Sequence, residues 1–371
     1  MGFKVCIIYI VLLILYLIYY FNVVVEQPNV YYSEKMKNVY TDIPSINKNV
    51  YWTLGCHNNL IQYFIYKIES KIDKYIGKEF YKTNIIITPD NEKLIMGIGN
   101  INYKFDGILL IFHTIFGTYC DGACSVKKIC KELNLLPISY SRRGHGIKLN
   151  NLKFNTVGHM EDLELILDYI ENKYPNKPIY GLARSAGTNL LSRYLGNRKH
   201  KSRISLAILI SPGFDFNKSL ISMNSKFNKM LVNKCKDFWL TPNKELFTKN
   251  KKDLKYYNLL LNASNLQEWH NYQWYFTRTT KNEKEYNNVY NPIHVLKKIK
   301  IPILYINAMD DFLFNKTVVS NYKNLVNESD YKIVIHTKGG SHLGFYENLF
   351  NDWSFKISKE FITSVKKNII N

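Results

Sequence analysis

Short apolar runs alternate with amphipathic stretches along most of the chain from Thr83 onward. Apolar runs of about four to eight residues between turn-forming residues predict buried strands, and apolar positions that recur every three or four residues predict helices. The predicted strands are residues 84–88, 94–99, 107–112, 137–141, 178–182 and 204–211, and the predicted helices are residues 122–134, 159–173 and 186–196. Because helices cover both faces of a sheet when strands and helices alternate, we expect an α/β fold with a mainly parallel sheet.

The alternation stops at residues 213–300, which are polar, aromatic and mostly helical in pattern. It resumes with predicted strands at 301–307 and 331–336 and a terminal helix near 350–367. We interpret residues 82–371 as one domain into which residues 213–300 are inserted as a helical cap or lid. The large aromatic residues of the insertion either line a binding cavity or form its own core; they are Trp239, Trp269, Trp274, Tyr275 and Phe276.

The N-terminal segment is apolar enough to predict a membrane anchor. Residues 5–20 carry no charge, and the apolar stretch continues to Val25. About 20 apolar residues suffice to span a bilayer, whereas a cleaved signal peptide has an apolar region of about 7–15 residues and a small-residue cleavage site. No such site follows, so we expect residues 1–25 to form a single-pass anchor, with an endomembrane location, and residues 26–81 to form a pre-core segment. A cleaved signal peptide is the alternative, and the sidedness of the anchor stays open.

The net charge of the chain adds little to these predictions. A net charge of +20 raises the possibility of nucleic-acid binding, but the lysines are dispersed among Asn and Tyr, and no recognition motif is present. Attraction to anionic lipid headgroups is the more natural consequence for an anchored protein. The six cysteines show no C-x-x-C pair and no metal-ligand spacing, and no nucleotide-binding fingerprint occurs. The sequence therefore predicts no specific nucleic-acid partner, no metal and no cofactor.

The residues around Ser185 form the most informative pattern in the chain. Residues 178–195 read PIYGLARSAGTNLLSRYL: an apolar run, then small residues around a serine, then a helical pattern. This order is typical of a nucleophile elbow, in which a strand turns sharply into a helix with the serine at the apex. The tight turn requires small residues two before and two after the serine, and Ala183 and Gly187 meet that requirement. A helix-capping serine gives a similar pattern, so the interpretation depends on partner residues elsewhere.

Candidate partners follow downstream at the ends of two predicted strands. The strand at 301–307 leads into Asp310 and Asp311, and the strand at 331–336 leads into a glycine-flanked loop that carries His342. Serine, then aspartate, then histidine is the chain order of the α/β-hydrolases. Asp310 and Asp311 compete for the role of the acid.

A fourth segment supplies candidate oxyanion donors. The strand at 107–112 runs into HTIFGT, and in α/β-hydrolases the loop after this strand and the residue after the nucleophile each contribute one backbone N–H. This nominates the N–H groups of Ile115 and Ala186, with His113 in a structural role under the loop. An ordinary exit from a strand is the alternative.

Several blocks of the sequence resemble the α/β-hydrolase superfamily, and specifically its membrane-anchored, YheT-like branch of abhydrolase-domain esterases and lipases. The blocks occur in order from about residue 50 to the end of the chain: WTLGCHNNLIQ from Trp52, YSRRGHG from Tyr140, FNTVGHMEDL from Phe154, SAGTNLL from Ser185, NAMDD from Asn307 and GGSHLGFYE from Gly339. The resemblance implies an α/β-hydrolase fold with a cap, and it places the catalytic acid on Asp311.

Together these features predict a serine hydrolase with a Ser185–His342–Asp311 triad that cleaves carboxylic esters, with lipids, phospholipids or acylglycerols as the expected substrates. Two alternatives remain open at this point. One is an acyltransferase or thioesterase that uses the same triad, and the other is a catalytically silent membrane scaffold with the same fold.

Overall fold

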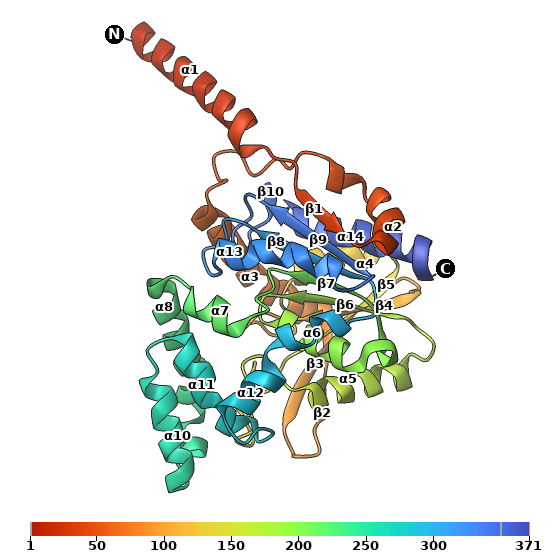
Figure 1. Ribbon diagram of the computed structural model, residues 1–371, viewed down its shortest axis with the longest axis vertical. Helices are drawn as coiled ribbons and strands as arrows, with labels where there is room; N and C mark the ends of the chain where they lie inside the picture. Colours follow the sequence, from red (N-terminus) through yellow and green to blue (C-terminus); the bar gives the residue numbers. More distant parts are fainter. Residues whose placement is uncertain (1, 349–350, 371) are drawn as a thin grey trace.

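A computed structural model describes residues 2–348 and 351–370 of the chain (Figure 1). Its strands are β1 (Asn29–Tyr32), β2 (Tyr81–Ile87), β3 (Lys93–Gly99), β4 (Gly107–Phe112), β5 (Leu135–Tyr140), β6 (Ile179–Arg184), β7 (Ile204–Ile210), β8 (Ile303–Ala308), β9 (Lys332–Thr337), β10 (Tyr346–Asn348) and β11 (Asn351–Asp352). Its α-helices are α1 (Gly2–Tyr19), α2 (Lys37–Thr41), α3 (Asn59–Phe80), α4 (Ala123–Glu132), α5 (Met160–Lys173), α6 (Gly187–Arg198), α7 (Phe216–Ile221), α8 (Ser225–Cys235), α9 (Lys244–Phe247), α10 (Lys251–Asn262), α11 (Leu266–Thr277), α12 (Glu283–Tyr290), α13 (Lys316–Ser320) and α14 (Trp353–Val365).

The main sheet has the strand order β1-β9-β8-β7-β6-β4-β5-β3-β2. The central strands from β5 to β9 pair in parallel, whereas β1, β2 and β3 pair antiparallel at the two edges. In a sheet of this kind the carboxyl ends of the parallel strands lie at one edge, where ligands bind. The loops after β4, β6, β8 and β9 therefore meet at the same edge of the sheet.

Helices cover both faces of the sheet, as the alternation of elements predicts. Successive residues of a strand point to opposite faces, and in β4 Leu109 and Ile111 face α4 and α14, whereas Ile108 and Leu110 face α5 and α6. Every residue of β4 is buried. This two-sided burial explains why the central strands read as continuous apolar runs.

Residues 213–300 form helices α7 to α12, which gather on one side of the sheet (Figure 1). They have a hydrophobic core of their own, in which Trp239, Trp269 and Phe276 are fully buried. The core extends to Phe154 and Val157, which precede α5. The insertion is therefore packed onto the loops at the edge of the sheet that carries the candidate site.

Helix α1 projects away from the rest of the protein (Figure 1). Residues 4–24 are long and apolar enough to cross a membrane, and most of these side chains are exposed. At its end, the Tyr20 hydroxyl donates to the Trp52 carbonyl oxygen at 2.6 Å. The apolar segment therefore ends in a buried contact with the folded part of the chain.

The structure confirms the predicted fold class and the type of each predicted strand and helix, with boundaries that shift by a few residues. The terminal helix begins at Trp353, and residue 350 of the predicted range lies outside the described residues. The sequence analysis missed β1, which pairs Asn29 with His336 across the chain. Residues 29–32 are thus an edge strand of the main sheet.

Candidate active site

Ser185 occupies the sharp turn between β6 and α6. Its backbone has a positive φ of 49°, a strained conformation for a residue with a side chain, and its N–H donates to the Ile210 carbonyl oxygen at 2.9 Å. A Cβ atom at Gly187 would overlap the carbonyl oxygen of Phe112 in the neighbouring strand. The small residue two positions after the serine is therefore required by the close approach of α6 to β4.

Ser185, His342 and Asp311 form a continuous hydrogen-bonded chain. Ser185 Oγ lies 2.8 Å from His342 Nε2, and His342 Nδ1 lies 2.8 Å from Asp311 Oδ2. The histidine and aspartate side chains are almost fully buried. The structure thus brings together three residues that lie up to 157 positions apart in the sequence.

The adjacent carboxylate of Asp310 has different partners. Asp310 Oδ1 accepts a hydrogen bond from the Ser341 N–H at 2.7 Å, and the Asp310 carbonyl oxygen accepts one from the Asn59 side chain. Burial, together with the negative charge of Asp311, raises the pKa of Asp310 to about 7. Of the two candidate acids, it is Asp311 that contacts His342.

Ile115 and Ala186 line the same cavity as Ser185 and His342. In the part of the chain that the structure describes, neither backbone N–H donates to an acceptor of the protein. Two such donors beside a nucleophile can hold the negative oxygen of a tetrahedral intermediate. Their role as oxyanion donors stays a prediction.

The loop that carries Ile115 is held by residues that the sequence analysis did not single out. The buried Arg142 guanidinium donates to the carbonyl oxygens of His113 and Thr114 at 2.8 and 2.9 Å. His145 Nε2 lies 3.0 Å from the Ile115 carbonyl oxygen. Each residue from 113 to 115 therefore has its backbone oxygen fixed by a side chain of the loop after β5. Arg142 and His145 belong to the YSRRGHG block, but only the three-dimensional contacts show that this block holds the candidate oxyanion loop.

His113 has the structural role that was predicted for it. It is buried, its Nδ1 lies 2.8 Å from the Thr114 carbonyl oxygen, and its Nε2 accepts a hydrogen bond from the Arg142 N–H. Burial, then the charge of Arg142, lowers the pKa of His113 well below its ordinary value. The neutral ring thus links the candidate oxyanion loop to the loop after β5.

Asp121 connects the candidate oxyanion loop to the serine turn. Its Oδ2 accepts a hydrogen bond from the Thr114 N–H at 2.7 Å, and its Oδ1 lies 3.5 Å from the guanidinium of Arg184, the residue before Ser185. The Arg184 guanidinium also lies over the Tyr66 ring at 5.3 Å. This buried ion pair links the two loops, although none of the three guanidinium nitrogens has a hydrogen-bond partner among the described residues.

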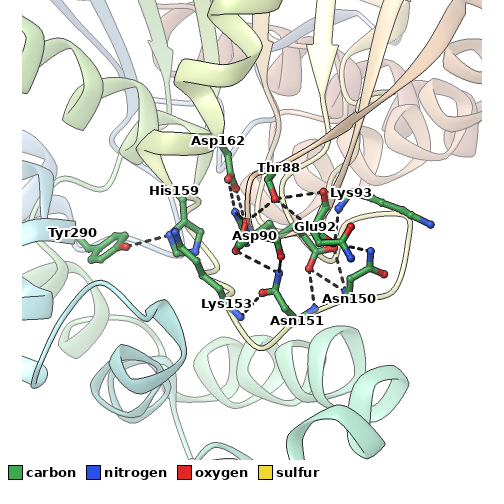
Figure 2. Close-up of polar contacts among 12 residues, drawn as sticks. Thr88, Asp90, Glu92, Lys93, Asn150, Asn151, Lys153, His159, Asp162 and Tyr290 are labelled. Atoms are coloured by element: carbon green, nitrogen blue, oxygen red, sulfur yellow. Dashed lines mark hydrogen bonds and ion pairs between the residues drawn. The ribbon is translucent and has the colours of Figure 1, made fainter.

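A second polar cluster surrounds Asp90 and Glu92 (Figure 2). Arg143 pairs with Asp90 and Asp162 at 2.5 and 2.7 Å, and Figure 2 shows the Glu92 carboxylate between Lys93, Asn150 and Asn151. The Glu92 oxygens accept the backbone N–H groups of all three residues. Arg143 and backbone N–H groups of the protein bind these carboxylates. We therefore interpret the cluster as a structural support for the loop that carries Arg142 and His145. No group of His, Cys, Asp and Glu in the described residues is arranged to hold a metal ion.

Ser185 and His342 open into a cavity of about 370 Å³. The insertion contributes an apolar wall made of Phe216, Leu220, Met223, Met230, Leu231 and Leu266. None of the five aromatic residues that were considered as wall residues is among the described residues that line this cavity. Their alternative role as the core of the insertion is confirmed for Trp239, Trp269, Tyr275 and Phe276, and Trp274 packs against that core.

Comparisons with known proteins agree with this architecture. Residues 109–349 match the alpha/beta hydrolase fold family. Monoacylglycerol lipase ABHD2 of Danio rerio is 21% identical over 54% of this chain and 50% of its own length, and phospholipase ABHD3 of Homo sapiens is 23% identical over 64% and 58%. The chain thus spans about half the length of these curated relatives.

One solved structure, of a protein of unknown function from Staphylococcus aureus subsp. aureus Mu50, shares the fold. It superposes with a TM-score of 0.53 at 17% identity, over 77% of this chain and 98% of that chain. The strand order, the serine turn and the extent of the family match point to the same conclusion: this chain belongs to the α/β-hydrolase fold family.

Proposed function

We propose that the protein is a serine hydrolase that cleaves carboxylic esters of lipids through an acyl-enzyme. The observation that carries the proposal is the hydrogen-bonded chain from Asp311 through His342 to Ser185, which ends at an apolar cavity. Such a chain activates a serine hydroxyl, because the histidine accepts its proton while the aspartate stabilises the charged imidazole.

In the proposed first step, Ser185 Oγ forms a bond to the ester carbonyl carbon while its proton passes to His342 Nε2. The carbonyl oxygen becomes negative, and the N–H groups of Ile115 and Ala186 hold it. The carbon–oxygen bond to the alcohol then breaks, and His342 returns the proton to the leaving oxygen. Loss of one oxyanion donor typically costs about 2.7–4 kcal/mol of transition-state stabilisation.

In the second step, water attacks the acyl carbon and gives a proton to His342. The bond between the acyl carbon and Ser185 Oγ breaks, the serine regains its proton, and the fatty acid leaves. No cofactor enters either step, because the triad supplies both the nucleophile and the proton transfers.

The apolar wall of the cavity supports an acyl chain as the bound part of the substrate. The two relatives, by their names, act on a monoacylglycerol and on phospholipids, which supports a lipid ester. We also propose that residues 1–25 anchor the chain in an internal membrane and that residues 213–300 act as the cap of the catalytic domain. An anchored enzyme of this kind takes its substrate from the bilayer or its surface.

Labelling with a fluorophosphonate probe tests the proposal. Wild-type protein in membranes should be labelled covalently, and Ser185→Ala should abolish the labelling. Ser192→Ala is the matched control, because Ser192 is a buried serine of α6, about two helical turns after Ser185. Labelling that persists in Ser185→Ala would contradict the assignment of the nucleophile, and a wild-type protein that is never labelled would favour the silent scaffold.

Analysis of products separates hydrolysis from acyl transfer. Incubation with an acyl-labelled monoacylglycerol should release free fatty acid. Labelled ester or thioester products that form from an added alcohol or thiol at the expense of the acid would instead favour an acyltransferase. Faster cleavage of thioesters than of esters with the same acyl chain would favour a thioesterase.

A further inference from the structure

The cavity beside Ser185 has a second wall of different chemistry. Helix α3 contributes Lys67, Ser70 and Lys74, and α8 contributes Lys234. Residues spaced by three, four and seven positions share one face of a helix, so the α3 residues form a continuous polar strip along the cavity. Lys74 and Lys234 are exposed and Lys67 is half-buried, which places this strip where the cavity meets solvent.

These lysines have no acidic partner. Among the described residues none of the three forms an ion pair, and no Asp or Glu lines the cavity. Other lysines of the chain are paired, such as Lys35 with Asp330 and Lys359 with Glu132, both at less than 3 Å. Partial desolvation, and then the charges of Lys67 and Lys74, lower the pKa of Lys234 to about 8. Three like charges are thus gathered at one place; the charge of Asp121 acts on Lys67, but none of the three lysines forms an ion pair among the described residues.

The wall formed by Lys67, Lys74 and Lys234 lies close to the candidate oxyanion loop. Lys234 Nζ is 4.3 Å from the centre of the Phe116 ring, and Phe116 directly follows Ile115. Lys67 Nζ is 5.9 Å from the centre of the Tyr63 ring, which also lines the cavity. An anion held by these ammonium groups would belong to a molecule that also reaches Ser185.

The cavity is also lined by apolar side chains, among them Leu220, Met223, Leu231 and Leu266. A ligand that satisfies both kinds of lining carries an acyl chain and an anion. A phosphate monoester fits the cationic end best, because it offers a charge of about −1.5 to −2 and three acceptor oxygens to three ammonium groups. A zwitterionic headgroup fits less well, since its positive charge would lie near the three lysine ammonium groups that line the cavity.

We propose that Lys67, Lys74 and Lys234 form a subsite for the phosphate monoester of an acyl ester substrate, of the lysophosphatidate type. The proposal rests on the proposed function, because it assigns a substrate class to the same cavity. It is a statement about specificity and adds no step to the chemistry at Ser185.

The test compares substrates with one acyl chain and three headgroups in neutral detergent micelles: oleoyl lysophosphatidate, oleoyl lysophosphatidylcholine and monooleoylglycerol. The full-length wild-type protein should show its highest kcat/KM with lysophosphatidate. In Lys67→Gln/Lys234→Gln, the ratio of kcat/KM for lysophosphatidate to that for monooleoylglycerol should fall at least tenfold, which corresponds to about 1.4 kcal/mol. A wild-type preference for either other lipid, or a ratio that the double variant leaves unchanged, would overturn the proposal.

Lys71→Gln is the matched control, because Lys71 lies on α3 between the subsite lysines but does not line the cavity. It removes a positive charge from the same helix, so it should leave the ratio unchanged. A drop equal to that of the double variant would assign the effect to the general charge of the surface and overturn the subsite. Circular dichroism and the thermal midpoint of each variant show whether it is folded.

A binding measurement separates this proposal from the proposed function. Dodecyl phosphate, dodecanol and inorganic phosphate are titrated into full-length Ser185→Ala by calorimetry, which needs no turnover. Tighter binding of dodecyl phosphate than of dodecanol, lost in Ser185→Ala/Lys67→Gln/Lys234→Gln, supports the subsite even if no ester is cleaved. Equal affinity for inorganic phosphate and dodecyl phosphate would show that the site binds free phosphate. Equal affinity for dodecanol and dodecyl phosphate would overturn the subsite.

Discussion

His342 Nδ1 shares a 2.8 Å hydrogen bond with Asp311 Oδ2, whereas Asp310, the residue before it, accepts the backbone N–H of Ser341. Two adjacent carboxylates thus hold the same loop in different ways. Asp311 contacts the imidazole of His342, and Asp310 fixes the backbone of Ser341, the residue before His342.

Replacement of each aspartate by asparagine should distinguish these roles. Asp311→Asn should lower kcat by about 10³–10⁴, because the amide favours the wrong tautomer of His342. Asp310→Asn should lower it much less, because an amide oxygen can still accept the Ser341 N–H. Turnover of a short nitrophenyl ester measures both. Equal losses, or a larger loss in Asp310→Asn, would move the acid role to Asp310.

Arg142 is expected to act as a positioning residue for the candidate oxyanion loop. In Arg142→Lys the single ammonium group cannot replace the two guanidinium contacts with His113 and Thr114. We expect kcat for the nitrophenyl ester to fall at least tenfold with little change in KM, since the loop matters most when charge develops on the oxygen. Arg198→Lys, an exposed arginine of α6, is the control. A rise in KM at constant kcat would instead indicate a role in substrate binding.

Lys332 should make the stability of the fold depend on alkaline pH. Its side chain is fully buried in β9, its Nζ has no hydrogen-bond partner in the described residues, and burial lowers its pKa from 10.5 to about 8. Below pH 8 the folded state bears the full cost of the buried charge, roughly 3 kcal/mol. Between pH 8 and 10.5 the folded state releases its proton while the unfolded state keeps it, so stability should rise with pH over that range.

The variant Lys332→Met should remove this dependence. It should raise the free energy of unfolding at pH 7 and give a smaller gain near pH 10, as measured by urea unfolding. The exposed Lys128→Met serves as the control and should change neither value, because Lys128 is not among the charges that act on Lys332. A gain that is the same at both pH values would show that the Lys332 ammonium is not the cause.

Removal of the apolar segment should release the protein from membranes without loss of activity, provided that the contacts at its end are kept. A chain that begins at Tyr20 retains the bond to Trp52, and it should be extracted by carbonate and cleave soluble esters. A chain that begins at Gln27 also lacks Glu26, whose carboxylate accepts hydrogen bonds from Trp52 Nε1, the Lys338 N–H and the Gly339 N–H. We expect this shorter chain to have a lower thermal midpoint. Carbonate-resistant binding of the Tyr20 chain would show that another surface inserts into the membrane.

The sequence was most informative where local pattern and chemistry coincide. The central strands could be predicted from their continuous apolar runs, which arise because both faces of the sheet are buried. The tight turn at Ser185 could be predicted because the small neighbours it requires lie in one stretch of sequence. The fixed order of serine, aspartate and histidine at strand ends then suggested which residues would meet.

Features that depend on long-range partners were not predictable in the same way. Strand β1 is four residues long, and its pairing with β9 joins positions about 300 residues apart. Arg142 looks like any arginine in a loop until the carbonyl oxygens of His113 and Thr114 are placed beside it. The lysines at 67 and 234 were two among many in a basic chain, and only the packing of α3 near α8 brings them to one cavity.

Glu26 joins the end of the N-terminal helix to the loop that carries His342. Its carboxylate holds the N–H groups of Lys338 and Gly339 at 2.5 and 2.9 Å, and Gly339 lies three residues before the histidine. The end of the N-terminal helix is thus tied to Trp52 through Tyr20 and to the histidine loop through Glu26. A displacement of α1 relative to the fold would therefore also displace the loop that carries one of the reacting groups.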